Sequence, residues 1–347
     1  MKVGLTRLAS LRLQPKTSAL LLILVLIVTL TSCTKPTSRI PADEAEKISI
    51  AVTPWPASAA VYVAHEKGYF RDEGLQETLR EYPSGHLGLA DLFTGKIDVA
   101  TCGDTSIARA AVNGKPAMVV ATLSEIDRAI LIIARNDRNI SKPDDFIGKR
   151  VGRVKGTSAD FFLHIYLTTS YIDQKDVHVV DLEPDEVVEA LVNGRVDAVS
   201  TCSPFTIQLR DRLGGNAVVL EEPNFYTMTW NAVAKKEFTE KRPETVKRFL
   251  RAIIRANSYI KDDPAEARAI SAKYIGTDSP LYAEEWKNYD FTAELDQSLI
   301  VNLEDQARWM VSSGDDNSAQ RTHDFADHVY ADGLKAIRPG AVRMVGR

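Results

Sequence analysis

The sequence predicts an α/β protein made of two α/β lobes joined by a hinge that the chain crosses twice. Three observations lead to this fold class. Short β-branched runs alternate with amphipathic stretches, one strand-and-turn segment recurs later in the chain, and two apolar runs are placed where the chain would pass between the lobes. The length of 347 residues suits about two domains. Strand–helix alternation with short connections indicates parallel pairing and right-handed crossovers.

The start of the chain indicates export. Its first 16 residues carry four basic side chains and no acid, and the apolar run Ala19–Leu30 follows. This run is shorter than the roughly 20 residues that a membrane-spanning helix needs, and the charge order is that of a secretory signal. Leu30-Thr31-Ser32-Cys33 resembles the bacterial lipobox, whose cysteine is lipidated. We expect a signal peptide over residues 1–32, lipidation at Cys33 and a tether over 33–46; the alternative is an uncleaved membrane anchor.

Composition and charge exclude several classes of protein. Hydrophobic residues make up 44% of the chain and charged residues 26%, as in folded globular proteins rather than disordered ones. Beyond residue 32 the chain has 39 basic and 47 acidic side chains, so it is a poor nucleic-acid binder. Neither Cys102 nor Cys202 has metal-ligand spacing, and a disulfide between them is allowed but not required. Nucleophile elbows, phosphate-binding loops and dinucleotide fingerprints are absent, so we expect no catalytic residue, metal or cofactor.

The expected elements follow in chain order. The first lobe has strands near 48–52, 75–82 and 97–100, and helices over 58–67, stopped by Gly68, and from 84 to 93, with Asp104 capping the next helix. The apolar runs 130–134 and 227–234 would join the lobes. From 237 to 330 we expect helices, with Pro243 at a first helical position. Residues 47–130 and 235–345 then form lobe I, and residues 135–230 form lobe II.

An internal repeat supports two similar lobes. Gly95–Thr101 (GKIDVAT) recurs 99 residues later as Gly194–Ser200 (GRVDAVS). Both copies follow a predicted helix and lead into a loop and another helix. Such turns also resemble one another in unrelated α/β proteins, but a single long interval suits two lobes better than an array of short repeats.

The candidate ligand-binding residues lie where predicted strands end, because ligands of open α/β sheets bind beyond the carboxyl ends of the strands. Loops rich in Gly, Ser and Thr at helix starts expose N–H groups that suit a small anion. Asp104 is either a helix cap or a partner for an ammonium group, and Lys155 or Arg128 could supply a positive charge. The alternative is that these residues only cap helices and that Cys102 and Cys202 are buried. The candidates are Trp55, Ser84, Gly85, Gly103, Asp104, Thr105, Gly156, Thr157, Ser158, Cys202, Ser203 and Trp230.

A family resemblance covers roughly residues 47–234. The segment Ala64–Leu75 (AHEKGYFRDEGL) resembles a motif of the substrate-binding proteins of ABC importers, in the branch for nitrate, sulfonates, taurine and thiamine-pyrimidine precursors. Physically this motif is a helix stopped by Gly68, an aromatic pair over its end, and a turn at Gly74. Gly95–Thr101, Gly103-Asp104 and Gly156-Thr157-Ser158 match the usual succession of that family.

The resemblance implies a type II periplasmic-binding-protein fold whose lobes close over a small solute, with ligand contacts from the strand-end loops. It implies an anionic or zwitterionic organic solute such as a sulfonate, taurine or nitrate, and an ABC permease with its ATPase as partners. The protein would be a monomer, lipid-anchored on the periplasmic or extracellular face of the membrane. The cysteine-rich motif of pyrimidine-precursor proteins is absent, which counts against that ligand. The alternatives are an enzyme on the same fold (a small-molecule lyase or a pyrimidine synthase) and a sensory lipoprotein.

Overall fold

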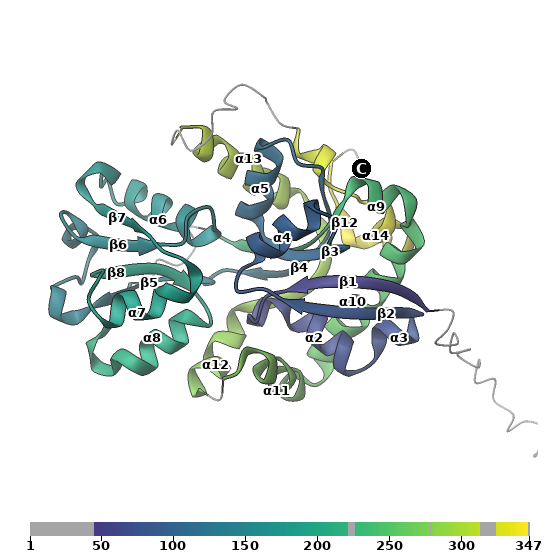
Figure 1. Ribbon diagram of the computed structural model, residues 1–347, viewed down its shortest axis with the longest axis horizontal. Coiled ribbons are helices and arrows are strands. Elements are labelled where there is room, and N and C mark those ends of the chain that lie inside the picture. The colour runs from purple at the N-terminus through teal and green to yellow at the C-terminus, as the bar shows by residue number, and fades with distance from the viewer. Residues whose placement is uncertain (1–44, 221–225, 278, 313–323, 346–347) are drawn as a thin grey trace, which may run out of the picture. The chain divides into compact units, whose positions relative to one another are not determined.

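The computed structural model describes residues 45–220, 226–277, 279–312 and 324–345 (Figure 1). The predicted signal peptide, Cys33 and nearly all of the tether lie outside these ranges. Residues 40–347 belong to one compact unit. Within the described ranges, no helix combines the length and the apolar character needed to cross a membrane.

The fold is mixed α/β with two sheets, as predicted (Figure 1). We call the seven-stranded sheet with its helices the first lobe, and the five-stranded sheet with its helices the second lobe. In spatial order the first sheet contains β12 (Val342–Arg343), β11 (Tyr289–Asp296), β4 (Ala117–Ile126), β10 (Met228–Lys235), β3 (Val99–Gly103), β1 (Glu46–Val52) and β2 (Leu75–Glu81). The second contains β7 (His178–Asp181), β6 (Arg150–Arg153), β8 (Ala198–Cys202), β5 (Ile130–Arg135) and β9 (Ala217–Leu220).

The two sheets share one strand order. The run β2-β1-β3-β10-β4 of the first sheet corresponds to β7-β6-β8-β5-β9 of the second. The first three strands of each run are parallel, but the fourth is antiparallel to its neighbours. The sequence pattern predicted parallel pairing, but each sheet also contains antiparallel pairs. Within these runs the exceptions are β10 and β5, the strands that enter each sheet after the chain has crossed from the other one. In the first sheet β11 is also antiparallel to its neighbour β4.

Helices cover both faces of the sheets. In the second lobe α6 (Ser158–Thr169) lies on one face and α7 (Val187–Val192) and α8 (Phe205–Leu213) on the other (Figure 1). The first lobe contains α2 (Ala59–Glu66), α3 (Tyr69–Asp72), α4 (Gly85–Phe93), α5 (Asp104–Val112), α9 (Lys236–Lys241), α10 (Pro243–Asp262), α11 (Pro264–Ile275), α12 (Pro280–Glu285), α13 (Gln297–Ser312) and α14 (Asp332–Ile337). As predicted, Pro243 begins α10, and this helix buries Val246, Phe249 and Ile253 at helical spacing.

Three details differ from the sequence prediction. Residues 237–330 are not all helical, because β11 lies between α12 and α13 and buries Phe291, Ala293 and Leu295 at every second position. The third strand is shifted, to Val99–Gly103. Asp104 is the first residue of α5, and the cap position before it belongs to Gly103.

The repeated segments occupy equivalent positions in the two sheets. Gly95 and Gly194 have φ angles of 79° and 73°, a left-handed conformation that glycine adopts without steric cost. The Asp98 carboxylate accepts the backbone N–H of Ser49 on β1 at 2.8 Å, and the Asp197 carboxylate accepts that of Arg150 on β6 at 2.9 Å. Through this hydrogen bond the repeated aspartate connects the start of β3 to β1 in the first lobe and the start of β8 to β6 in the second.

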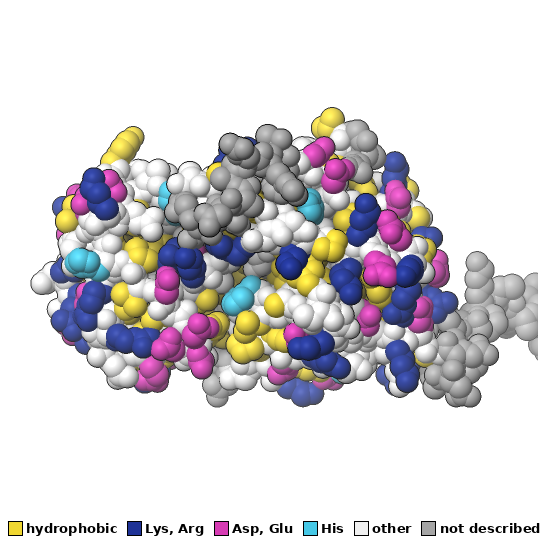
Figure 2. Space-filling model, turned by 45° about the horizontal axis from the view of Figure 1, so that its top comes forward, with side chains coloured by type: hydrophobic (Ala, Val, Ile, Leu, Met, Phe, Trp, Pro, Cys, Tyr) yellow, Lys and Arg dark blue, Asp and Glu magenta, His cyan; other side chains and the backbone are white. Residues whose placement is uncertain are grey.

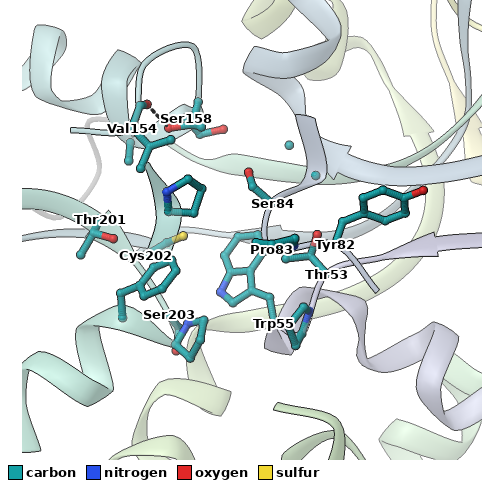
Figure 3. A pocket seen from close by; sticks show the side chains of 18 of the residues that line it. Thr53, Trp55, Tyr82, Pro83, Ser84, Val154, Ser158, Thr201, Cys202 and Ser203 are labelled. Carbon is teal, nitrogen blue, oxygen red and sulfur yellow. Dashed lines mark hydrogen bonds between the residues drawn. The ribbon is translucent and has the colours of Figure 1, made fainter. Parts of the chain in front are cut away.

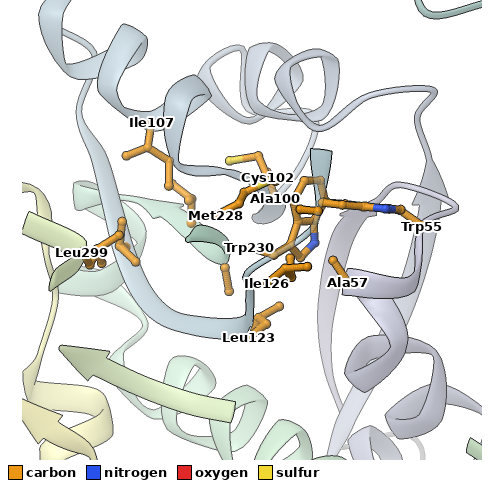
Figure 4. Close-up of a cluster of buried hydrophobic side chains, with 14 of the residues drawn as sticks. Trp55, Ala57, Ala100, Cys102, Ile107, Leu123, Ile126, Met228, Trp230 and Leu299 are labelled. Carbon is orange, nitrogen blue, oxygen red and sulfur yellow. The ribbon is translucent and has the colours of Figure 1, made fainter. Parts of the chain in front are cut away.

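The hydrophobic core of the first lobe extends to the carboxyl ends of its strands. Trp55, directly after β1, packs edge-to-face on Trp230 of β10 with ring centroids 4.6 Å apart (Figure 4). Both indole side chains are at least 96% buried. These two rings therefore form an apolar wall where the first lobe faces the second.

Candidate functional site

A cavity of about 520 Å³ lies at the carboxyl ends of the parallel strands of both lobes. Residues at the ends of β1, β2 and β3 line it from the first lobe, and residues at the ends of β6, β7 and β8 line it from the second. In Figure 3, Trp55 and Ser84 of the first lobe lie opposite Ser158 and Cys202 of the second. A volume of this size suits a small organic molecule.

The structure brings most of the predicted site residues together at this cavity. Those that line it are Trp55, Ser84, Gly85, Gly103, Thr157, Ser158, Cys202, Ser203 and Trp230. Asp104, Thr105 and Gly156 do not line it, and neither do Lys155 and Arg128. A solute contact at any of these positions remains a prediction.

Asp104 is fully buried and does not line the cavity, and its carboxylate is hydrogen-bonded to other groups of the protein. It accepts the backbone N–H of Thr105 at 2.8 Å and of Thr229 at 3.1 Å, and the hydroxyl of Ser158 at 3.1 Å. The Tyr226 hydroxyl also donates to it. Burial raises the pKa of Asp104, and these bonds oppose the rise. Since Ser158 begins α6, this carboxylate joins the first lobe to the second.

Glu285 forms a second buried link between the lobes. It ends α12 and is 8% exposed, and its carboxylate accepts the hydroxyl of Thr206, in the first turn of α8, at 2.8 Å. Burial raises the pKa of Glu285, while Ser203 and Thr206 lower it. Asp104 and Glu285 therefore each place a first-lobe carboxylate beside the start of a second-lobe helix.

The histidine beside the cavity and the cysteine that lines it are poorly suited to acid–base and nucleophilic chemistry. His86 bonds through Nδ1 to the Ser84 hydroxyl at 2.8 Å, and burial lowers the pKa of the imidazole, so it is neutral at pH 7. Cys202 lines the cavity, but burial raises the pKa of its thiol to about 12. Cys102 is fully buried, and both cysteines are free thiols. A thiol that stays protonated is a weak nucleophile.

Four residues that line the cavity carry a buried polar side-chain atom without a hydrogen-bond partner within the described ranges. The atoms are Oγ1 of Thr53, Nε1 of Trp55, Oγ of Ser203 and Nε1 of Trp230. An unpaired buried polar atom costs about 1–3 kcal/mol. The cavity thus combines apolar walls with a few unsatisfied polar atoms, as small-molecule sites do.

Several lining residues were not among the predicted candidates. Thr53, Tyr82 and Thr201 follow the same strand-end rule and could have been found by it. Asp185 follows β7, a strand that the sequence analysis did not identify. Ile275 lies at the end of α11, and no sequence signal connects this position to the cavity.

Several named proteins are similar to this chain in sequence. A putative binding protein of Brucella abortus is 24% identical over 229 residues, covering 65% of this chain and 70% of that protein. A putative aliphatic sulfonates-binding protein of Bacillus subtilis is 24% identical over 250 residues, covering 70% and 75%. The taurine-binding periplasmic protein of Escherichia coli is 25% identical over 222 residues, covering 62% and 67%.

Solved structures share the fold. The alkanesulfonate-binding protein SsuA of Xanthomonas axonopodis, bound to MOPS, superposes with a TM-score of 0.73 at 19% identity, covering 83% of this chain and 99% of that one. The desulfurization enzyme DszB superposes with a TM-score of 0.61 at 15% identity, covering 84% and 98%. The family model described as NMT1/THI5 like matches residues 55–267, and the chain therefore belongs to the NMT1/THI5-like family.

Proposed function

We propose that this protein is the solute-binding component of an ABC importer, which captures a small organic molecule between its lobes and presents it to a membrane permease. The observation that carries this proposal is the cavity of about 520 Å³, lined by the strand ends of both lobes. The names of the sulfonates-binding and taurine-binding relatives support it. A solute that touches both lobes favours their closed arrangement by its differential affinity for the two states.

The proposal includes export, a lipid anchor at Cys33 and a monomeric state. A Cys33→Ser variant expressed in a bacterial host would then be released from the membrane, whereas the parent protein would stay in the membrane fraction. Release of the parent protein, or retention of the variant, would contradict the anchor. Light scattering of the detergent-solubilised protein tests the monomer.

We further propose capture without chemical change. The structural similarity to DszB makes an enzyme the second candidate, but the neutral His86 and the protonated Cys202 disfavour it. Thermal unfolding against a panel of sulfonates, taurine, nitrate, aromatic acids, pyrimidines and amines tests solute binding. A solute at 100 times its Kd stabilises the fold by about 2.7 kcal/mol. Mass spectrometry of the recovered solute then separates the candidates, because a product would identify an enzyme.

A further inference from the structure

The charges at the cavity have one sign. Among the described residues that line it there is no Arg, Lys or His, and the charged ones are Glu81 of the first lobe and Asp185 of the second. On the surface, by contrast, basic and acidic side chains are interspersed over the face shown in Figure 2. A net anion entering this cavity would lose hydration without meeting a cationic side chain, which is costly.

The N–H groups at a helix start could bind an anion in place of a cationic side chain. At the starts of α5 and α6, however, carboxylates of the protein itself already lie beside these groups. Asp104 accepts the N–H of Thr105 in the first turn of α5 and the hydroxyl of Ser158 at the start of α6. Asp160 accepts the N–H of Gly156, just before α6, at 2.8 Å. These acids take the position that a bound anion would otherwise occupy.

Two of the cations near α6, Arg153 and Arg109, interact with the same acids, and neither they nor Lys155 line the cavity. Arg153 pairs with Asp160 and, at 3.0 Å, with Asp181. Arg109 also lowers the pKa of Asp160 and lies against Gly156, outside the cavity lining. Arg153 is therefore held in internal ion pairs, and the start of α6 presents no basic side chain among the described residues that line the cavity.

Of the remaining two helix starts, that of α8 follows the same pattern and that of α4 does not. Glu285 lies beside the first turn of α8 through its bond from Thr206. At α4, no acid lies in the first turn, but His86 is neutral and its charged neighbours are Glu183 and Arg109. The start of α4 is thus the one place among these four where an electronegative atom of a solute would not compete with a neighbouring bonded carboxylate.

We propose that the solute is a neutral or positively charged molecule with an apolar body, that Glu81 and Asp185 face its positive or N–H-bearing end, and that the cavity disfavours net anions. This inference rests on the proposed solute-binding function and specifies its substrate class. The Trp55–Trp230 wall accommodates the apolar body. The proposed charge is opposite to that of an alkanesulfonate without an amino group.

The test uses three probes that share a morpholinopropyl body and differ in the group at its end. They are 4-(3-aminopropyl)morpholine, 3-morpholinopropan-1-ol and MOPS, the last being the molecule bound by the Xanthomonas protein. Calorimetry on the full-length processed protein at about pH 8.5, where the primary amine is protonated and the morpholine nitrogen is neutral, should give Kd values that increase in the order amine, alcohol, MOPS. We expect MOPS to bind at least about tenfold more weakly than the amine, because its sulfonate is desolvated without a cationic partner.

Substitutions test whether the two lining acids cause the expected preference for the amine. Glu81→Gln combined with Asp185→Asn should weaken amine binding about fivefold and leave alcohol binding unchanged, since both acids are exposed. Asp173→Asn is the matched control, because this acid lies in the second lobe, bonds to Lys175 and does not line the cavity. Ser84→Lys places a cation at the start of α4 and should tighten MOPS binding about tenfold.

The outcomes separate this inference from the function on which it rests. MOPS binding as tightly as the amine, or a preference for the amine that survives the double variant, overturns the charge assignment and leaves solute binding intact. If none of the probes binds, the protein is incubated with yeast extract and the retained small molecules are identified by mass spectrometry. A neutral or cationic solute supports the inference and an anion overturns it. Retention of no small molecule contradicts the proposed function, and the inference with it.

Discussion

The two repeated segments of the chain are alike in backbone and differ in what they present to the cavity. Around β3 and β8 the same left-handed glycine and the same aspartate fasten a strand to its neighbour. Beyond the strands the similarity ends. The acid beside α5 is Asp104 of that helix itself, whereas the acid beside α8 is Glu285, from a helix of the other lobe. The repeated unit therefore sets the framework, and residues outside it set the chemistry.

The largest expected effect distinguishes the two buried carboxylates. Asp104→Ala leaves the Tyr226 and Ser158 hydroxyls and the Thr229 N–H without their acceptor, so we expect a loss of about 3–5 kcal/mol in the free energy of unfolding. Glu285→Ala removes the acceptor of Thr206 and should cost about 1–3 kcal/mol. Urea unfolding measures both. Equal losses would show that the two acids have equivalent roles.

The pH dependence of stability should have opposite signs at Asp104 and at Asp197. Burial raises the folded-state pKa of Asp104 above its ordinary 3.8, so its contribution to stability falls as the pH rises from 3.8 through that pKa. Burial also raises the pKa of Asp197, but the bonds from Arg150 outweigh burial and lower it below 3.8. Its contribution is present above 3.8 and is lost as the pH falls through the folded-state pKa.

Urea unfolding of Asp104→Asn and Asp197→Asn between pH 3 and pH 7, each against the parent protein, measures these two contributions. The stability of the parent relative to Asp104→Asn should decrease with rising pH, and its stability relative to Asp197→Asn should increase. Curves of the same sign would contradict the assignment of burial as the dominant cause at Asp104.

A smaller effect compares the two strand-fastening aspartates. Asp197→Ala should cost about 2 kcal/mol, because its carboxylate is 9% exposed and bonds to both the backbone and the guanidinium of Arg150. Asp98→Ala should cost about 1 kcal/mol, because that carboxylate is 32% exposed and bonds to Ser49. Thermal unfolding ranks the two variants, and the reverse order would show that burial does not set the difference.

The smallest effect concerns the repeated glycines. Gly95→Ala and Gly194→Ala each force alanine into a left-handed conformation and should each cost about 1 kcal/mol. An added Cβ at Gly194 would lie 3.0 Å from a terminal nitrogen of Arg138, a flexible group that can move away. The two losses should therefore agree within about 0.5 kcal/mol by urea unfolding. A much larger loss at one position would contradict the equivalence of the two turns.

The sequence located the candidate site better than it described the chemistry there. Strand-end loops such as Ser84-Gly85 and Thr157-Ser158 were identifiable because strand ends of an α/β sheet converge. The partners of Asp104 were not identifiable, because Ser158 and Tyr226 are 54 and 122 residues away and meet it only after folding. The strand β11 was missed because its alternating pattern is short and lies between helices.

The order of strands in the first sheet has a consequence for how the chain folds. β4 lies between β10 and β11, which follow it only after the entire second lobe has been made. A nascent chain that ends at β9 has neither neighbour of β4, and pairing between segments so distant in sequence is intrinsically slow. The first lobe is therefore completed last, although its synthesis begins first. Such delayed folding is compatible with the export proposed above, because a polypeptide crosses a translocation channel in an unfolded, extended state.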